Sequence, residues 1–171
     1  MAMKLISLVI AGTLMATPSG PGQVREPSRE WKEATSWPGG STFRLVDAGG
    51  KVLLSERDLV YYSWRSHTLV LRRGVIAMVN AALTGSLVGG IPFRVMANGV
   101  VCYAGVFTTI VSSLAQSCPV INVTPLPKDS EKWDKLSITL GYPTAKFFRG
   151  KDPRGDRRIQ QALAALRKLK E

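Results

Sequence analysis

Hydrophobic and polar residues alternate in short runs over most of the chain from Thr42 onward. Phe43 and Leu45 lie on either side of Arg44, and residues 136–140 alternate in the same way. This period of two residues is typical of half-buried strands. Strands are therefore predicted at 43–45, within 51–64, at 67–71, on both sides of a Ser-rich loop in 106–123, and last at 135–141.

The most regular stretch is GGIPFRVMANGVVCYAGVF, residues 89–107, in which Asn98-Gly99 lies between two apolar runs. Asn-Gly is a strong hairpin signal, because both central residues of a type I′ turn need positive φ. We interpret this hairpin as a wall of the core. The predicted pairs are Ala97 with Val100, Val95 with Cys102, and Phe93 with Ala104, and these six residues form the face expected to be buried.

Two segments have helical periodicity instead. In VIAMVNAALTGSL, residues 75–87, apolar residues recur at helical spacing and Gly85 would end the helix, although a buried strand is an alternative. In DPRGDRRIQQALAALRKLKE, residues 152–171, Asp156 is a candidate N-cap. The chain is therefore predicted to be α+β, a mostly antiparallel sheet with one or two helices packed on one face. The apolar stripe of the second helix comprises Ile159, Ala162, Leu163, Leu166 and Leu169.

The beginning of the chain, MAMKLISLVIAGTLMATPSGPG, has the profile of a signal peptide over residues 1–16. Lys4 precedes the apolar run Leu5–Ala16, and small residues follow it, so cleavage after Ala16 is expected. The run is shorter than the about 20 apolar residues that span a bilayer. An uncleaved anchor or a buried amino-terminal helix is the alternative.

Residues 17–41 are rich in Pro, Gly, Ser and charged residues, which is the composition of a flexible tether. Residues 42–171 then form a single α+β domain with a basic C-terminal helix. With a cleaved leader, the mature protein is expected to be exported, either to a periplasm or to the exterior.

The formal net charge is +11, and residues 146–171 carry nine Lys or Arg and three acids. A basic surface attracts anionic partners at long range. A solvated end that only keeps the protein soluble is the alternative. RGD at 154–156 matches a cell-adhesion tripeptide, although a three-letter match beside a basic run is often chance. The candidate residues for binding an anionic partner are Arg149, Lys151, Arg154, Arg157 and Arg158.

Candidate chemistry is sparse. The chain has two cysteines, Cys102 and Cys118, and an even number suggests one disulfide in an oxidising compartment. Two buried free thiols are the alternative. His67 is the single histidine, so a hydrolytic triad would have to use it as the base. No Gly-x-Ser-x-Gly motif occurs, and neither a metal site nor a cofactor is predicted.

The order of three segments resembles the periplasmic head subdomain of the SecD/SecDF protein-export subunit. These are VIAMVNAALTGSL, GGIPFRVMANGVVCYAGVF and SSLAQSCPVINV, within residues 42–142. The resemblance implies a ferredoxin-like α+β module that contacts exported chains and has no active site. The multi-pass membrane part of that family is absent from this sequence, and with it the proton-relay residues.

These observations predict an exported, non-enzymatic binding module of the cell envelope. Its partner would be a protein or an anionic envelope component. A membrane surface is a candidate, whereas nucleic acid is not expected because an exported protein rarely meets it. Two alternatives remain: a small hydrolase that uses His67, and a basic binder of membrane or nucleic acid.

Overall fold

A computed structural model describes residues 41–123 and 134–171 of the chain. These residues form a nine-stranded sheet and two α-helices, so the predicted α+β fold with a mostly antiparallel sheet is confirmed. The predicted signal peptide and all but the last residue of the predicted tether lie outside the described residues. In the part that is described, no helix is long and apolar enough to cross a membrane.

The strand order in the sheet is β2-β1-β5-β6-β7-β8-β4-β3-β9. Only the pairs β6–β7 and β3–β9 are parallel. Four strands precede the first helix, so the βαββαβ order of a ferredoxin-like module is not the order observed. The strands are β1 (Phe43–Asp47), β2 (Val52–Ser55), β3 (Leu59–Ser63), β4 (Thr68–Leu71), β5 (Ile91–Ala97), β6 (Val100–Thr108), β7 (Gln116–Asn122), β8 (Asp134–Tyr142) and β9 (Leu169–Lys170).

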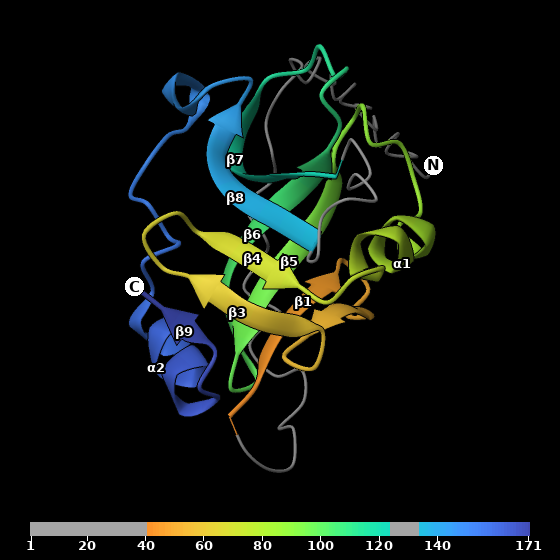
Figure 1. Cartoon of the computed structure of the whole chain (residues 1–171). Helices are drawn as coiled ribbons and strands as arrows, with labels where there is room; N and C mark the ends of the chain where they lie inside the picture. The colour runs from red at the N-terminus through yellow and green to blue at the C-terminus, as the bar shows by residue number, and fades with distance from the viewer. Residues whose placement is uncertain (1–40, 124–133) are drawn as a thin grey trace, which may run out of the picture. The chain divides into compact units, whose positions relative to one another are not determined.

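Strand β8 joins two layers of this sheet. Its first half, Asp134–Ser137, pairs with β4, and its second half pairs with β7. The sheet therefore folds over, and β3 and β4 lie in front of β1, β5 and β6 (Figure 1). The Phe43 ring in β1 faces the Tyr62 ring in β3, with centroids 6.2 Å apart. The largest side chains buried with them in the core are Phe93, Phe107, Leu45, Leu54, Leu59, Leu69, Leu71, Ile121, Ile138 and Ile159.

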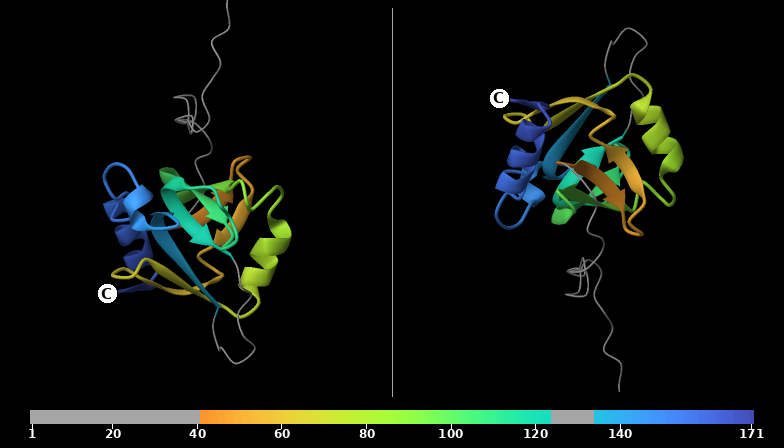
Figure 2. Two further views of the ribbon diagram at one scale, coloured as in Figure 1. Left: turned by 90° about the horizontal axis from the view of Figure 1, so that it is seen from above. Right: turned by 90° about the horizontal axis from the view of Figure 1, so that it is seen from below.

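The two helices, α1 (Val75–Ala82) and α2 (Arg157–Ala165), both bury apolar residues in this one core. They therefore pack on the inner face of the folded sheet, at opposite margins of the strands (Figure 2). The Asp156 carboxylate accepts a hydrogen bond from the Arg158 backbone N–H at 2.8 Å, which confirms the predicted cap of α2. A short 3-10 helix, η2 (Ala145–Phe147), follows β8.

Helix α1 is capped from a distant strand. The carboxylate of Asp134, a buried residue at the start of β8, accepts the Ile76 backbone N–H at 2.8 Å. The local N-cap, Gly74, offers no side chain. A negative group at this position satisfies a free N–H and complements the positive end of the helix dipole.

The second helix ends earlier than its apolar stripe predicts. Arg167 has φ +56°, and the N–H groups of Arg167 and Lys168 bond to the Ala164 and Leu163 carbonyl oxygens. This is a Schellman motif, which closes the helix with a left-handed residue. Leu169 therefore lies in β9 beside Tyr62 and is not part of the helical stripe, so the prediction is wrong at this residue. It follows that β9, and not β8, is the last strand.

The predicted hairpin turn is confirmed. Asn98 and Gly99 have φ values of +51° and +77°, and Ala97 pairs with Val100 across the turn. The prediction is also right for β5, because every second residue of this strand is buried. These buried residues are Ile91, Phe93, Val95 and Ala97.

The other strand of the hairpin departs from the predicted register. Val95 faces Tyr103 instead of Cys102, because a β-bulge adds one residue to β6 at this point. Neighbouring side chains point to opposite faces, so the bulge turns Tyr103 and Phe107 into the core. The three β6 residues predicted to be buried are instead exposed or half-buried: Val100, Cys102 and Ala104.

The shifted register also explains Gly105. A Cβ built on this residue would overlap the Pro119 carbonyl oxygen of β7 and lie 2.6 Å from Cζ of Phe93. The Phe93 ring fills this space and packs against Phe107, with centroids 4.9 Å apart. Only a residue without a side chain lets β6 and β7 approach each other here.

Candidate functional site

His67 lies in the turn between β3 and β4, packed between aromatic rings. Its Nδ1 is 2.9 Å from the Tyr62 hydroxyl, and its ring meets the edge of Trp64 at 5.8 Å between centroids. Burial lowers the pKa of His67, the charge of Arg154 lowers it further, and Asp152 acts in the opposite direction. In a Ser-His-Asp triad, Nδ1 binds the orienting carboxylate. Here it binds a buried phenol, so the contacts of His67 indicate a structural role.

The guanidinium of Arg154 is anchored on three sides. It donates to the Ile138 carbonyl oxygen at 2.7 Å and holds both Asp152 carboxylate oxygens at 2.8 and 3.0 Å. The hydrogen bonds from Arg154 lower the pKa of the Asp152 carboxyl. Only 16% of the Arg154 side chain is exposed. Arg154 therefore ties the loop before α2 to β8 and has little surface to offer a partner.

Arg158 is paired in the same way. Its guanidinium contacts the Asp156 carboxylate at 2.6 Å, and this hydrogen bonding lowers the pKa of the Asp156 carboxyl. We call residues 150–158 the C-terminal basic loop; both of its acids are thus paired with cations of the loop. Lys151 and Arg157 are exposed. Of the RGD tripeptide, both charged residues are engaged within the loop.

The structure has Cys102 and Cys118 as free cysteines, both half-buried. Burial raises the pKa of the Cys102 thiol to about 11 and also raises that of Cys118. The charges that act on Cys102 are those of Arg158 and Asp156, at the C-terminal basic loop. Cys118 instead follows Ser117, whose carbonyl accepts from Arg149 after η2. The predicted disulfide is therefore not a feature of this structure.

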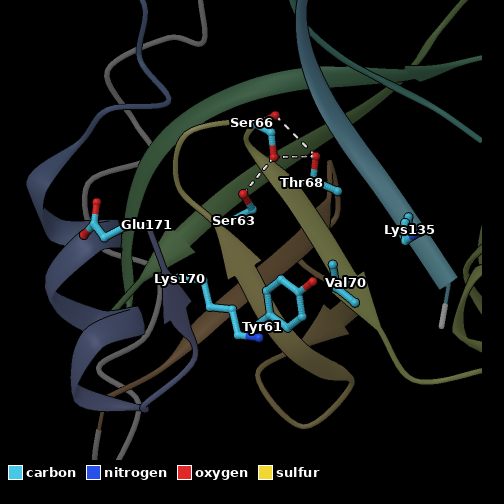
Figure 3. Close-up of a pocket in the computed structure, with 8 residues that line it drawn as sticks. All are labelled: Tyr61, Ser63, Ser66, Thr68, Val70, Lys135, Lys170 and Glu171. Atoms are coloured by element: carbon cyan, nitrogen blue, oxygen red, sulfur yellow. Dashed lines mark hydrogen bonds between the residues drawn. The ribbon is translucent and has the colours of Figure 1, made fainter. Parts of the chain in front are cut away.

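A shallow hollow of about 330 Å³ lies on the outer face of β3, β4, β8 and β9 (Figure 3). Hydroxyl groups line it: Ser66 Oγ bonds to Ser63 Oγ at 2.8 Å and to Thr68 Oγ1 at 3.0 Å. The ammonium group of Lys170 lies 3.9 Å from the centre of the Tyr61 ring. The hydroxyl groups thus hydrogen-bond to one another, and the ammonium group packs on the ring. None of the site residues predicted from the sequence lines the hollow.

A second surface lies at the end of the strands where the loop 109–115 joins β6 to β7, at the top of Figure 1. This loop exposes 57% of Ile110, 75% of Val111 and 50% of Leu114. Val88 in the neighbouring loop is also exposed. We call these four residues the apolar tip.

Hydrogen bonds hold the apolar tip in place. The Ser112 hydroxyl donates to the Val88 carbonyl oxygen at 2.7 Å, which joins the two loops. The Tyr142 hydroxyl donates to the Ile110 carbonyl oxygen at 2.8 Å, which joins the tip to the end of β8. The apolar side chains are therefore exposed on a loop that is fixed to the sheet.

Two cations flank the tip on the segment that follows β8. Lys146 and Arg149 are exposed, and the Arg149 N–H bonds to the Ser117 carbonyl oxygen at the start of β7. Phe147 between them is exposed as well. The described residues at this end belong to the segments 74–123 and 135–151, which contain no Asp or Glu. Among the described residues, cationic and apolar groups thus lie together without an acid from these segments.

Of the five predicted anion-binding residues, the structure places only Arg149 beside this surface. Lys146 and the apolar tip were missed by sequence reasoning. The signal that would have found them is the lack of Asp and Glu in residues 74–123 and 135–151, in a chain that carries twelve acids. A surface without acids does not repel a negatively charged partner, and nearby cations attract one.

No family model, no curated protein and no solved structure matches this chain. The fold and the surfaces above thus define its class by themselves: an α+β module with a fixed apolar tip flanked by two exposed cations.

Proposed function

We propose that this chain is an exported, non-enzymatic binding module of the cell envelope, and that the apolar tip with Lys146 and Arg149 is its binding surface. One observation carries the proposal: aliphatic side chains stand exposed on a loop fixed by hydrogen bonds, beside exposed cations in a segment, 135–151, that contains no acid. Contiguous apolar surface on a folded domain marks a contact with another molecule.

The amino-terminal sequence supports the location. A charged start, an apolar middle and a small-residue exit are the features of an export signal, and the Pro-, Gly- and Ser-rich residues 17–41 suit a tether.

The other functions receive less support from the described contacts. The His67 ring bonds to the Tyr62 hydroxyl and packs against rings, and these contacts support a structural role more than that of a catalytic base. A nucleic-acid binder would need its cations in one accessible row, whereas Arg154 and Arg158 are paired with acids of their own loop. A head-like module of the SecD kind would use the same apolar tip for an exported chain.

Photocrosslinking in living cells tests the proposal. A benzophenone amino acid at Val111 is expected to crosslink to an envelope component, because this side chain is 75% exposed at the centre of the tip. The matched control is the same probe at Val100, an apolar residue that is 48% exposed at the opposite end of β6. Adducts at position 100 that equal those at 111, or no adduct at 111, would remove the proposal.

A further inference from the structure

We infer that the molecule covering the apolar tip is an anionic lipid bilayer. This inference rests on the proposed function and names its partner. The tip would enter the boundary between headgroups and acyl chains, while Lys146 and Arg149 would bind headgroup phosphates.

Backbone polar groups must be satisfied within the protein where a loop enters lipid. In the loop 109–115 the Ser112 N–H bonds to the Thr109 carbonyl oxygen at 3.0 Å, and the Leu114 N–H bonds to Ser112 Oγ at 3.2 Å. The Ile110 carbonyl oxygen accepts from Tyr142. The Val88 carbonyl oxygen accepts from Ser112. These five backbone groups are satisfied within the protein, so each of them can leave water at low cost.

The exposed side chains of the apolar tip suit lipid. The tip exposes only Ile, Val and Leu, and the loop 109–115 contains no aromatic or charged residue. Protein interfaces gain most of their affinity from Trp, Tyr and Arg that fill pockets of the partner. Aliphatic side chains, with the exposed Phe147 on the neighbouring segment, match the hydrocarbon of a bilayer, which gains from buried apolar area and needs no fixed complement.

The charge beside the apolar tip suits an anionic membrane. Basic residues near an anionic membrane surface are attracted to it, whereas acids are repelled. Lys146 and Arg149 flank the tip, and residues 74–123 and 135–151 have no acid that would face the headgroups. The charge of this end is thus complementary to an anionic membrane surface.

Sedimentation of the mature chain with vesicles tests the inference. Vesicles of phosphatidylcholine with about 30% phosphatidylglycerol are expected to bind the protein at least about tenfold more tightly than phosphatidylcholine alone. Binding should weaken as salt rises from about 0.1 M to about 0.5 M, because the cations are screened. Equal binding to both compositions, or no binding to either, would overturn the inference.

Variants locate the contact on the protein. Replacing Val111 and Leu114 together by Ser should lower the partition coefficient by about tenfold or more, because two aliphatic side chains no longer enter the lipid. Replacing Lys146 and Arg149 together by Gln should lower it by about tenfold or more and remove most of its salt dependence. The tip is exposed, so circular dichroism should report an unchanged fold.

Matched controls come from the same chain. The double variant Val52→Ser/Val100→Ser removes two exposed apolar side chains away from the tip, and Arg157→Gln removes an exposed cation near Asp156. Each should change vesicle binding by less than about twofold. Losses as large as those of the tip variants would overturn the inference.

The two proposals fail separately. A protein adduct from the probe at Val111, with no binding to anionic vesicles, would overturn the lipid partner and retain the binding surface. An adduct of lipid mass at Val111, together with vesicle binding, would support both. No adduct at Val111 and no vesicle binding would overturn both.

Discussion

Two neighbouring segments of this chain are basic, and they use their charge differently. In the C-terminal basic loop, Arg154 and Arg158 bind Asp152 and Asp156 at 2.8 and 2.6 Å. Lys146 and Arg149, a few residues earlier, lie beside the apolar tip in a part of the sequence without acids. The first segment pairs Arg154 and Arg158 internally and holds the start of α2 to β8, whereas we propose that the second leaves its charges for a partner.

This difference shows why net charge alone is a poor guide to a binding surface. A guanidinium that is already bonded to a carboxylate would have to give up those bonds to bind an anion, and the paired acid repels the same anion. The five cations chosen from the sequence were chosen for density along the chain. The structure distinguishes them by their partners.

The largest effect should come from the close approach of β6 and β7, the strands that carry the loop 109–115. Gly105→Ala should lower the free energy of unfolding by about 3 kcal/mol or more, because its Cβ would overlap the Pro119 carbonyl oxygen and the Phe93 ring. Gly155→Ala in the C-terminal basic loop meets no atom within 4 Å. It should change stability by less than about 0.5 kcal/mol. Urea denaturation measures both, and similar values would contradict the packing described here.

The next effect concerns the paired cation. Arg154→Met should lower the free energy of unfolding by about 2 kcal/mol, because the Ile138 carbonyl and the Asp152 carboxylate lose their donor. Arg149→Met removes a cation of the other segment and should cost less than about 0.5 kcal/mol. Equal losses in urea denaturation would mean that the two segments do not differ as proposed.

A smaller effect on the free energy of unfolding is expected when the pH is lowered. The pKa values of the Asp152 and Asp156 carboxyls are lowered by hydrogen bonds from Arg154 and Arg158. Each carboxylate therefore contributes its full stabilisation at a pH above the pKa of the unfolded state, about 3.9. This contribution is lost as the pH falls through the lower pKa of the folded state. Solvent screening keeps the effect modest.

Variants Asp152→Asn and Asp156→Asn should flatten the acid limb of the stability curve measured by thermal unfolding. The double variant of Lys146 and Arg149 to Gln should leave the shape of that limb unchanged. An acid limb that is the same in the wild type and in both Asn variants would show that the pairs carry no pH-dependent stability.

The smallest effect concerns the two thiols, one near each segment. The unreduced mature protein should have the mass of two free thiols. Iodoacetamide should alkylate Cys102 slowly at pH 8 in the folded state, because burial raises its pKa to about 11. Urea should make the reaction fast. The mass of a disulfide, or rapid alkylation of the folded protein, would contradict the placement of these residues.

The sequence predicts the fold class and most elements because their signals are local. The Asn98-Gly99 turn, the alternation in β5 and the Asp156 cap each depend on residues within a few positions of one another. The bulge at Cys102 has no such signal, because it follows from the packing of Phe93 over Gly105 across the hairpin. One extra residue then reverses the face of every side chain after it.

Two other misses have the same origin in distant contacts. Helix α2 ends at Ala165, and Arg167 after its C-cap takes a left-handed conformation that glycine usually supplies, so nothing in the sequence marks the stop. The following residues leave the helix to pair with β3 as β9. Asp134 caps α1 from a position that is fifty-eight residues away, which no capping pattern could reveal.

The candidate site was predictable only in part. Sequence reasoning identified Arg149, because it counted cations, but it missed the tip, because Ile110, Val111 and Leu114 read as part of a strand and a loop. Their exposure depends on where the loop 109–115 lies against Val88 and Tyr142. A contact surface built from three separate segments becomes visible only once the fold brings them together.

The most direct test of the account is hydrogen–deuterium exchange of the mature protein with and without vesicles that contain phosphatidylglycerol. Slower exchange is predicted in the loops 83–90 and 109–115 and in the segment 143–149, with no change in residues 150–158. Protection confined to 150–158, or no protection in the three segments of the tip, would contradict it.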